Sequence, residues 1–226
     1  MNFIDSQNLY IGISEKKDGP MKSSSDNRFL FFKSKGLDNK IIVSAGLVHK
    51  NNVAIVDNIK GGEIIANCDA LITCQNKNLL TITVADCLPI YFYDREKGVV
   101  ALAHAGWRGV TANIIKEVVD TFVNHYASNL GDIEVLIGPH IKDCHFEVKD
   151  DVSSQFKNHN IIIRDRKTYI SLSRVVKEQL LQQGINNINI SDECTYCLNK
   201  KYFSYRRDNP KDLETMIAYI GLKTKE

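Results

Sequence analysis

The sequence of 226 residues lacks several features that mark other classes of protein. No apolar run approaches the ~20 residues of a membrane-spanning helix, so no membrane association is expected. Charge of one sign is not in excess either: 29 Lys and Arg residues face 27 Asp and Glu residues. The net charge of +2 gives no reason to expect nucleic acid or an anionic membrane as a partner. Residues 1–5 lack the basic region and apolar core of a signal peptide, which favours a cytoplasmic location.

Linkers and repeats are missing as well. No proline- or glycine-rich segment divides the chain, and no internal repeat is visible. We therefore expect one α/β domain over residues 1–226, in which helices pack on a mixed β-sheet as a three-layer sandwich. Residues 15–20 and 22–26 are rich in polar and turn-forming side chains and predict an exposed loop.

The apolar pattern predicts the elements of this fold. Helical spacing is clearest over residues 111–126, with Thr111 as a candidate cap. A second helix is predicted over residues 172–183, between Ser171 as cap and Gly184 as stop. Because a helix stands between two apolar runs at 99–103 and 133–137, the order indicates a parallel crossover. Short apolar runs predict strands at residues 40–44, 52–56, 63–66, 70–73, 79–84, 90–93, 99–103, 133–137, 187–190 and 216–221.

Two motifs at strand ends carry the strongest chemical signal. Ala-Asp-Cys-Leu-Pro at residues 85–89 follows one predicted strand, and His-Ala-Gly-Trp-Arg-Gly at residues 104–109 follows another. They bring Cys87 and His104 to strand ends, where open α/β sheets usually keep their chemistry. Thiolate and imidazole are the side chains that zinc and copper prefer. The carboxylate of Asp86 would disfavour a free thiolate at its neighbour, so metal ligation explains the pair better than an unassisted nucleophile does.

The other cysteines and histidines leave the ligand set open. Six cysteines without a secretion signal indicate free or metal-bound thiols rather than disulfides. A third ligand beside Cys87 and His104 can come from His49, His140 or His145, and spacing alone does not choose among them. The remaining two histidines, His125 and His159, are expected in solvent.

Cys194 and Cys197 have the spacing of a zinc-ribbon pair, but such a site needs a matching second pair. Cys68 and Cys74 do not supply it, because five residues separate them and a predicted strand lies between. A second zinc site is therefore not expected from the sequence.

Basic side chains near the two motifs predict an anion site. Arg108 can contact phosphate in a bidentate manner, and a helix that begins near Thr111 would direct backbone donors at the same turn. Gly106 and Gly109 allow the backbone a close approach to a ligand. A structural role, in which Arg108 only braces the turn, explains the same residues.

The two motifs resemble the two signatures of the laccase-domain family. Members of this family are also called multicopper polyphenol oxidoreductases and, more recently, purine nucleoside phosphorylases. The likeness covers most of the chain and extends to further segments of the family's sequence pattern, at residues 26–28, 69–73, 138–148, 194–195 and 203–208.

The resemblance implies a function and a ligand set. His49, Cys87 and His104 match the family's metal ligands, and one of Arg206 and Arg207 is expected to face the active site. The implied reaction is cleavage of adenosine, inosine, guanosine or methylthioadenosine by phosphate, with deamination of adenosine beside it. The chain departs from the family at Leu47 and Lys50 around the histidine, near its N-terminus and at residues 209–212, so the resemblance implies no substrate contacts from the last two regions.

The number of histidines indicates whether the chain can be a conventional multicopper oxidase. A conventional multicopper oxidase needs a histidine-rich copper cluster, which six histidines and three methionines cannot build. Two histidines and one thiolate instead match catalytic Zn²⁺ with an open position, with copper as the alternative metal. Asp86 can serve as acid or base, or can orient a ligand. The alternatives are a metal-free hydrolase or deamidase using Cys87 and His104, a copper-dependent polyphenol oxidase, and a non-catalytic metal-binding partner protein.

Overall fold

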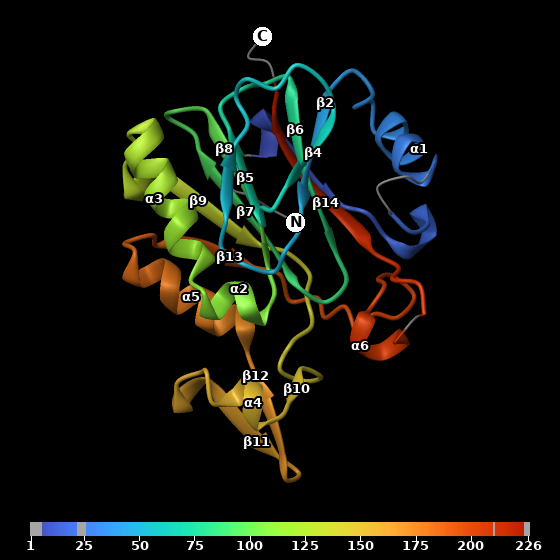
Figure 1. Ribbon diagram of the computed structural model, residues 1–226, viewed down its shortest axis with the longest axis vertical. Helices are drawn as coiled ribbons and strands as arrows, with labels where there is room; N and C mark the ends of the chain where they lie inside the picture. The colour runs from blue at the N-terminus through green and yellow to red at the C-terminus, as the bar shows by residue number, and fades with distance from the viewer. Residues whose placement is uncertain (1–5, 22–25, 210, 224–226) are drawn as a thin grey trace.

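The structure is a computed structural model and describes residues 6–21, 26–209 and 211–223. The strands of these ranges form two large sheets and one small sheet, with helices on the outer faces (Figure 1). The expected mixed α/β architecture is therefore confirmed. Within the described ranges, no helix is both long enough and apolar enough to cross a membrane.

The first large sheet contains β7 (Leu88–Asp94) at its centre, antiparallel to both of its neighbours, β8 (Val99–Ala105) and β9 (Ile133–Ile137). Since both neighbours run against β7, they are parallel to each other, as the predicted crossover requires. The sheet is completed by two further parallel pairings, of β13 (Asn187–Ile190) with β9 and of β3 (Val53–Ile55) with β5 (Ala70–Thr73), and β5 runs antiparallel to β8.

The second large sheet has the strand order β1-β14-β6-β2-β4. Its strands are β1 (Leu9–Ile13), β14 (Met216–Leu222), β6 (Asn78–Val84), β2 (Ile41–Gly46) and β4 (Glu63–Ala66). β14 is antiparallel to β1 and β6, whereas β2 is parallel to both β6 and β4. The parallel pair β2–β6 matters for function, because the segments that follow these two strands leave the sheet at the same end of the strands.

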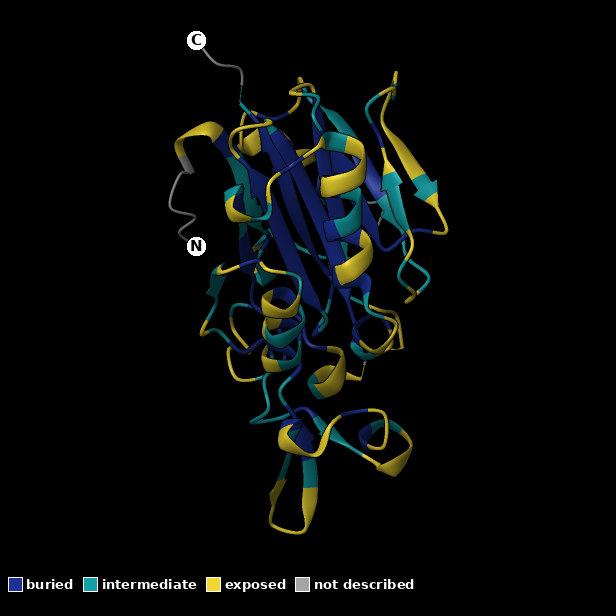
Figure 2. Ribbon diagram, turned by 90° about the vertical axis from the view of Figure 1, so that its left-hand side faces the viewer, coloured by how far each residue is buried: buried dark blue, intermediate teal, exposed yellow. Residues whose placement is uncertain are grey.

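The two sheets pack face to face, and helices cover their outer faces. Along β7, Tyr91 and Tyr93 face the second sheet, while Ile90 and Phe92 face α3 (Ile114–Tyr126) and α5 (Leu172–Gln182), as strand alternation requires. α1 (Asp26–Ser34) packs on the far face of the second sheet. The layers therefore number four rather than the expected three, and Figure 2 shows the buried strands between helices with exposed outer sides.

A small antiparallel sheet extends beyond one end of the large sheets (Figure 1). It consists of β10 (Glu147–Val148), β12 (Lys167–Ile170) and β11 (Ile161–Arg164), with α4 (Asp150–Ser153) beside it. The sequence pattern did not predict it, because these strands are short and half-exposed. Single turns of 3-10 helix lie at Ser6–Asn8, Lys16–Asp18, Leu130–Asp132 and Asn158–Asn160.

The helix predicted over residues 111–126 is confirmed from Ile114 on as α3, whereas Thr111 belongs to a separate short helix before it. α2 (Trp107–Thr111) begins directly after Gly106, and α3 follows only after Asn113, whose φ of 59° is left-handed and interrupts the helix. The prediction that Thr111 caps a helix is wrong, because its hydroxyl donates to the Arg108 carbonyl at 3.0 Å inside α2.

The helix predicted over residues 172–183 is confirmed as α5. Ser171 stands at its N-cap position, without a capping hydrogen bond from its side chain, and Gly184 follows with a φ of 88°. In the expected exposed loop, residues 22–25 lie outside the described residues. Residues 16–18 form a 3-10 turn, and Asp26 already belongs to α1.

Candidate active site

Cys87, His49 and His104 are brought together by the ends of three strands. Cys87 lies after β6 and His49 lies after β2, and these two strands run parallel. His104 is the penultimate residue of β8. Because β7 begins at Leu88, opposite Ala105, the antiparallel register places Cys87 next to the end of β8. The site therefore lies at the ends of strands from both large sheets, where the two sheets meet.

The donor atoms of these three residues lie within 4.8 Å of one another. The rings of His49 and His104 meet edge to face, with 4.9 Å between centroids. Of the three candidates that spacing left open, the structure thus brings His49 to Cys87 and His104. We call this group the His49 cluster. Its members differ in exposure, since His104 is buried and His49 lies at the surface.

Asp69 contacts both His104 and the loop that carries His49. It precedes β5, which pairs with β8, and its carboxylate lies 3.2 Å from His104 Nδ1. The same carboxylate accepts hydrogen bonds from the backbone amides of Val48, His49 and Lys50, two of them at 2.8 Å. One buried side chain therefore fixes both the His104 ring and the loop that carries His49, which has a left-handed φ of 58°.

The electrostatics of the cluster follow from burial and from these contacts. Burial lowers the pKa of His104, but the Cys87 sulfur and the Asp69 carboxylate outweigh it and raise that pKa to about 9. Burial and the neighbouring His104 lower the pKa of His49. For Asp69, burial is outweighed by hydrogen bonds from His104 and the backbone amides, so its pKa lies below the ordinary value. The Asp69 carboxylate and the Cys87 sulfur thus lie on either side of His104.

The residues present fit a metal ion. With Nδ1 of His104 held by Asp69, Nε2 is the ring nitrogen left for a metal, the arrangement found behind most metal-bound histidines. Two imidazoles and a thiol are the donor set that zinc accepts. A Cβ on Gly106 would lie 3.1 Å from Cys87 Sγ and 3.7 Å from the His49 ring. A glycine at this position therefore keeps the cluster free of a side chain.

Asp86 is buried beside Cys87 and is fully engaged by the C-terminal part of the chain. Its carboxylate accepts hydrogen bonds from Thr195 Oγ1 at 2.6 Å, Ser204 Oγ at 3.0 Å and the Arg206 amide at 2.7 Å. Its φ of 87° is left-handed, a conformation that costs energy for a non-glycine residue. These bonds hold the strained turn that presents Cys87.

A cavity of about 220 Å³ opens on the Cys87 side of the cluster, and we call it the Trp107 cavity. Arg108 lines it with its guanidinium 4.2 Å from the centre of the Trp107 ring. Arg206 reaches it from α6 (Tyr205–Asp208), above the Phe146 ring. A neighbouring hollow of about 350 Å³ shares Trp107, Phe146 and Arg206. Two exposed arginines therefore border the same apolar space.

Arg207 is placed differently. Its guanidinium pairs with Asp208 and donates to the carbonyls of Thr195, Tyr196 and Tyr202, each at 2.8 Å. Its donors are thus committed to the backbone of the segment that holds Asp86. Of the two arginines, Arg206 is the one that lines the Trp107 cavity.

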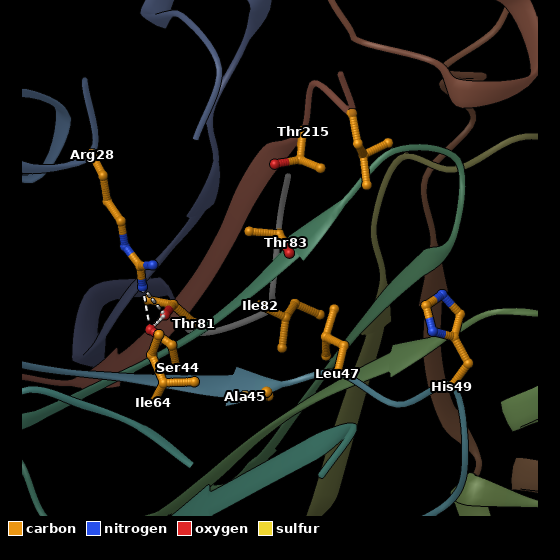
Figure 3. Close-up of a pocket in the computed structure, with 12 residues that line it drawn as sticks. Arg28, Ser44, Ala45, Leu47, His49, Ile64, Thr81, Ile82, Thr83 and Thr215 are labelled. Atoms are coloured by element: carbon orange, nitrogen blue, oxygen red, sulfur yellow. Dashed lines mark hydrogen bonds between the residues drawn. The ribbon is translucent and has the colours of Figure 1, made fainter. Parts of the chain in front are cut away.

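A larger cavity of about 620 Å³ lies on the other side of His49, along β2 and β6. Figure 3 shows Arg28 at one end of it and His49 at the other, with Leu47 and Ile82 between them. The Arg28 guanidinium is buried and donates to Ser44 Oγ and Thr81 Oγ1, and burial lowers its pKa. Within the described part of the chain, no carboxylate forms an ion pair with it. We call this space the Arg28 cavity.

The helix expected to point at an anion is not there. α3 begins at Ile114, after the interruption at Asn113, and α2 is only five residues long. The predicted helix start near Thr111 is therefore wrong, because Thr111 is the last residue of α2. Positive charge at the site comes from arginine side chains.

The remaining histidines and cysteines are sorted by the fold. His125 and His159 are exposed, as predicted, and His159 contacts Glu178 at 3.0 Å. His140 is buried, with Nδ1 2.8 Å from the Gly138 carbonyl. His145 lies with Cys144 next to Cys194 and Cys197, and the four donor atoms are within 4.8 Å of one another. The expectation that the Cys194–Cys197 pair lacks partners is therefore wrong.

Comparison with known proteins fits this geometry. A family model described as multi-copper polyphenol oxidoreductase laccase matches residues 5–223. The chain belongs to this family. A purine nucleoside phosphorylase from Clostridium acetobutylicum is 32% identical over 185 residues, which are 79% of this chain and 77% of the relative. An adenosine deaminase from an unknown prokaryotic organism is 30% identical over 224 residues, 90% and 85% of the two chains.

Solved structures of similar fold support the assignment. The protein YlmD from Geobacillus stearothermophilus has a TM-score of 0.89 at 27% identity, and 96% of this chain and 93% of that chain are covered. The hypothetical protein YfiH from Bacillus licheniformis has a TM-score of 0.87, also at 27% identity, over 97% and 94% of the chains.

Several residues of the site escaped the sequence reasoning. Asp69 and Arg28 were noted only as parts of matched segments, although a carboxylate just before an apolar strand is a signal for an orienting residue. Thr195 and Ser204 were likewise noted only inside matched segments, because their contact with Asp86 spans more than a hundred residues.

Proposed function

We propose that this protein is a zinc-dependent purine nucleoside phosphorylase, which cleaves adenosine, inosine, guanosine and methylthioadenosine with phosphate and also deaminates adenosine. The observation that carries the proposal is the convergence of His49, Cys87 and His104 beside an arginine-lined cavity. Relatives named purine nucleoside phosphorylase and adenosine deaminase, at 30–32% identity, support the class of substrate. The partners are therefore small molecules: a purine nucleoside and phosphate.

The chain's own residues orient the metal ligands. Zinc held by three protein ligands supplies a Lewis acid with one open position. Asp69 keeps the His104 ring in one tautomer and orientation through Nδ1, and it fixes the loop of His49 through three backbone amides. This support is independent of substrate, so the cluster is organised before a nucleoside arrives.

Arg108 and Arg206 are proposed to bind phosphate. Both line the Trp107 cavity, and guanidinium groups bind phosphate oxygens with paired hydrogen bonds. Trp107 and Phe146 give the same cavity apolar walls against which a sugar or base can pack. The Arg28 cavity, which starts at the opposite side of His49, offers room for the rest of the nucleoside.

Asp86 acts in this proposal as a positioning residue. Both of its carboxylate oxygens accept hydrogen bonds from the chain, so it is not a free acid or base. Through Thr195, Ser204 and the Arg206 amide it aligns Cys87 with the arginine proposed to hold phosphate. Its removal should therefore disturb both metal binding and phosphate binding.

The test uses the purified protein with a panel of nucleosides, with and without phosphate, before and after chelation. We expect release of free purine base that requires phosphate and that chelation abolishes. Metal analysis of the same sample should find zinc and would reveal copper if copper occupied the site. Base release that proceeds equally without phosphate would contradict phosphorolysis, and no turnover of any nucleoside would favour a non-catalytic metal-binding protein.

A metal-free hydrolase is the second candidate, favoured by one observation. His104 lies between Cys87 and Asp69, and these neighbours raise its pKa to about 9, so an imidazole stands beside the candidate nucleophile Cys87. In that case alkylation of Cys87 should abolish turnover, while chelation should leave turnover unchanged. Activity that is lost on chelation and restored by zinc rules out this candidate.

A further inference from the structure

A second group of metal-binding side chains lies outside the His49 cluster. Cys144 and His145 stand in the segment between β9 and β10, and Cys194 and Cys197 stand in the segment after β13. Since β9 and β13 pair in parallel, the two segments that follow them start at the same end of the sheet's strands. A backbone hydrogen bond from the Thr195 amide to the His140 carbonyl, at 3.1 Å, continues the pairing beyond the strands.

The sulfur–sulfur distances match a tetrahedral metal site, and the nitrogen–sulfur distances are a few tenths of an ångström shorter than in such a site. Cys144 Sγ lies 3.6 Å from Cys194 Sγ and 3.7 Å from Cys197 Sγ, and His145 Nδ1 lies 3.2 and 3.3 Å from two of the sulfurs. Ligands at zinc–sulfur and zinc–nitrogen distances of about 2.3 and 2.05 Å stand roughly 3.6–3.8 Å apart in a tetrahedron. A disulfide would need about 2.05 Å between sulfurs.

The surroundings hold these side chains in place. The His145 ring stacks on the Tyr196 ring, with 3.9 Å between centroids and 14° between planes. In the segment after β13, the Leu198 amide donates to the Cys194 carbonyl at 3.0 Å. The Arg164 guanidinium binds the Cys144 carbonyl at 2.9 Å. The four donors thus converge from two segments that are each braced by other contacts.

We propose that Cys144, His145, Cys194 and Cys197 form a structural zinc site, separate from the His49 cluster. We call the four residues the Cys194 cluster. Three thiolates and one imidazole fill all four positions of a tetrahedral ion, which is the mark of a structural rather than a catalytic site. Soft thiolates select zinc over magnesium or calcium.

The position of the Cys194 cluster indicates a role in stabilising the segment that contacts Asp86. Thr195 follows Cys194 directly and donates to Asp86, and Ser204 and the Arg206 amide complete the same contact. A metal at the Cys194 cluster would fasten this segment to the segment that carries Phe146 in the Trp107 cavity. The ion thus stabilises one wall of the candidate active site without touching substrate.

Metal content tests the proposal directly. We expect about two zinc ions per chain in the protein purified under reducing conditions, and about one in either Cys87→Ser or Cys197→Ser. The Cys74→Ser variant, which changes a half-exposed thiol outside both clusters, is the matched control and should keep the wild-type content. A Cys197→Ser protein with undiminished zinc would overturn the proposal.

Thiol labelling provides a second test on the wild-type chain, in case the variants fold poorly. Cys197 is exposed, so without a metal an alkylating reagent should reach its thiol. We expect peptide mass spectrometry to show Cys197 protected before chelation and labelled after it, while Cys74 labels equally in both samples. Equal labelling of Cys197 in both, or a native disulfide joining two of the three thiols, would sink the idea.

Discussion

The two clusters use the same kinds of side chain for different ends. The His49 cluster has three donors, lies between two cavities and is bordered by arginines. The Cys194 cluster has four donors, and its cysteines line neither the Trp107 cavity nor the Arg28 cavity. An open coordination position beside a cavity serves a reaction, whereas a filled tetrahedron serves the fold. Ligand count and surroundings, rather than ligand type, separate the two roles.

Their supports differ in the same way. In the His49 cluster the Asp69 carboxylate orients ligands through His104 and three backbone amides, so the protein alone preorganises the site. In the Cys194 cluster the described hydrogen bonds of the ligand side chains are to one another, and the two segments that carry them are joined by the backbone bond from Thr195 to His140. A metal there would add a stronger connection. We therefore expect metal loss to reduce activity in the first cluster and stability in the second.

The largest effect is expected from Cys87→Ser. This change removes the thiolate ligand of the His49 cluster, and with it the several kcal/mol of transition-state stabilisation that a metal supplies. Phosphate-dependent release of purine should fall by on the order of 10³-fold or more. Initial rates and thermal melting of the variant should be measured together. A variant that keeps its melting temperature and its activity would place the reaction elsewhere.

The opposite pattern is expected for Cys197→Ser. Loss of a structural metal belongs to the most destabilising changes, so we expect a cost of about 4 kcal/mol and a melting temperature lower by roughly 8–16 °C. Activity at low temperature should fall much less than in Cys87→Ser. Cys74→Ser serves again as the control. If Cys197→Ser abolishes turnover while its melting temperature stays unchanged, the two clusters do not divide the roles in this way.

Arg108→Ala tests the anion side of the comparison. Losing a charged hydrogen-bond partner should cost ~1.5–3 kcal/mol, or about ten- to a hundredfold in efficiency, through a higher KM for phosphate. Zinc content should not change, and adenosine deamination should suffer less because it uses water instead of phosphate.

The chain offers a matched control for this change. Arg174 is an exposed arginine of α5 and does not line the Trp107 cavity. Arg174→Ala should therefore leave the KM for phosphate unchanged. Equal loss of both reactions in Arg108→Ala, together with a lower melting temperature, would show instead that Arg108 braces the turn.

Asp69→Asn should weaken the His49 cluster without removing a ligand. The neutral amide keeps the shape but loses the charge that orients His104, and such changes behind a metal ligand cost about 10–100-fold in metal affinity or activity. Zinc titration against a competing chelator measures the loss. A matching loss of zinc from the Cys194 cluster would contradict the separation of the two sites.

Much of the His49 cluster could be predicted from the sequence. Apolar runs that end at residues 84 and 103 predicted Cys87 and His104 at strand ends, and the family resemblance indicated His49 as the third metal ligand. Spacing alone could not choose it, because the parallel pairing of β2 with β6 decides which loop reaches Cys87. The strands β4, β5, β9 and β13 were predicted to the residue, since each is a short apolar run between turn residues.

The Cys194 cluster was not predicted, for a physical reason. Cys144 and Cys194 are 50 residues apart, and their approach depends on the parallel pairing of β9 with β13. Both runs were predicted as strands, but the sequence did not predict that the two strands pair with each other. The interruption at Asn113 was missed because a left-handed residue breaks a helix without breaking its apolar pattern.

The smallest effect is expected at Lys50, where the family usually has glycine. Its backbone amide donates to Asp69 at 2.8 Å, while its side chain is exposed. Lys50→Ala keeps the amide, so stability should change by no more than about 0.5 kcal/mol, and zinc content should stay the same. This sharpens the comparison, because it separates the backbone support of the His49 cluster from nearby side-chain charge. If Lys50→Ala instead raises the KM for phosphate as Arg108→Ala does, the anion site extends to this loop and includes a third cation.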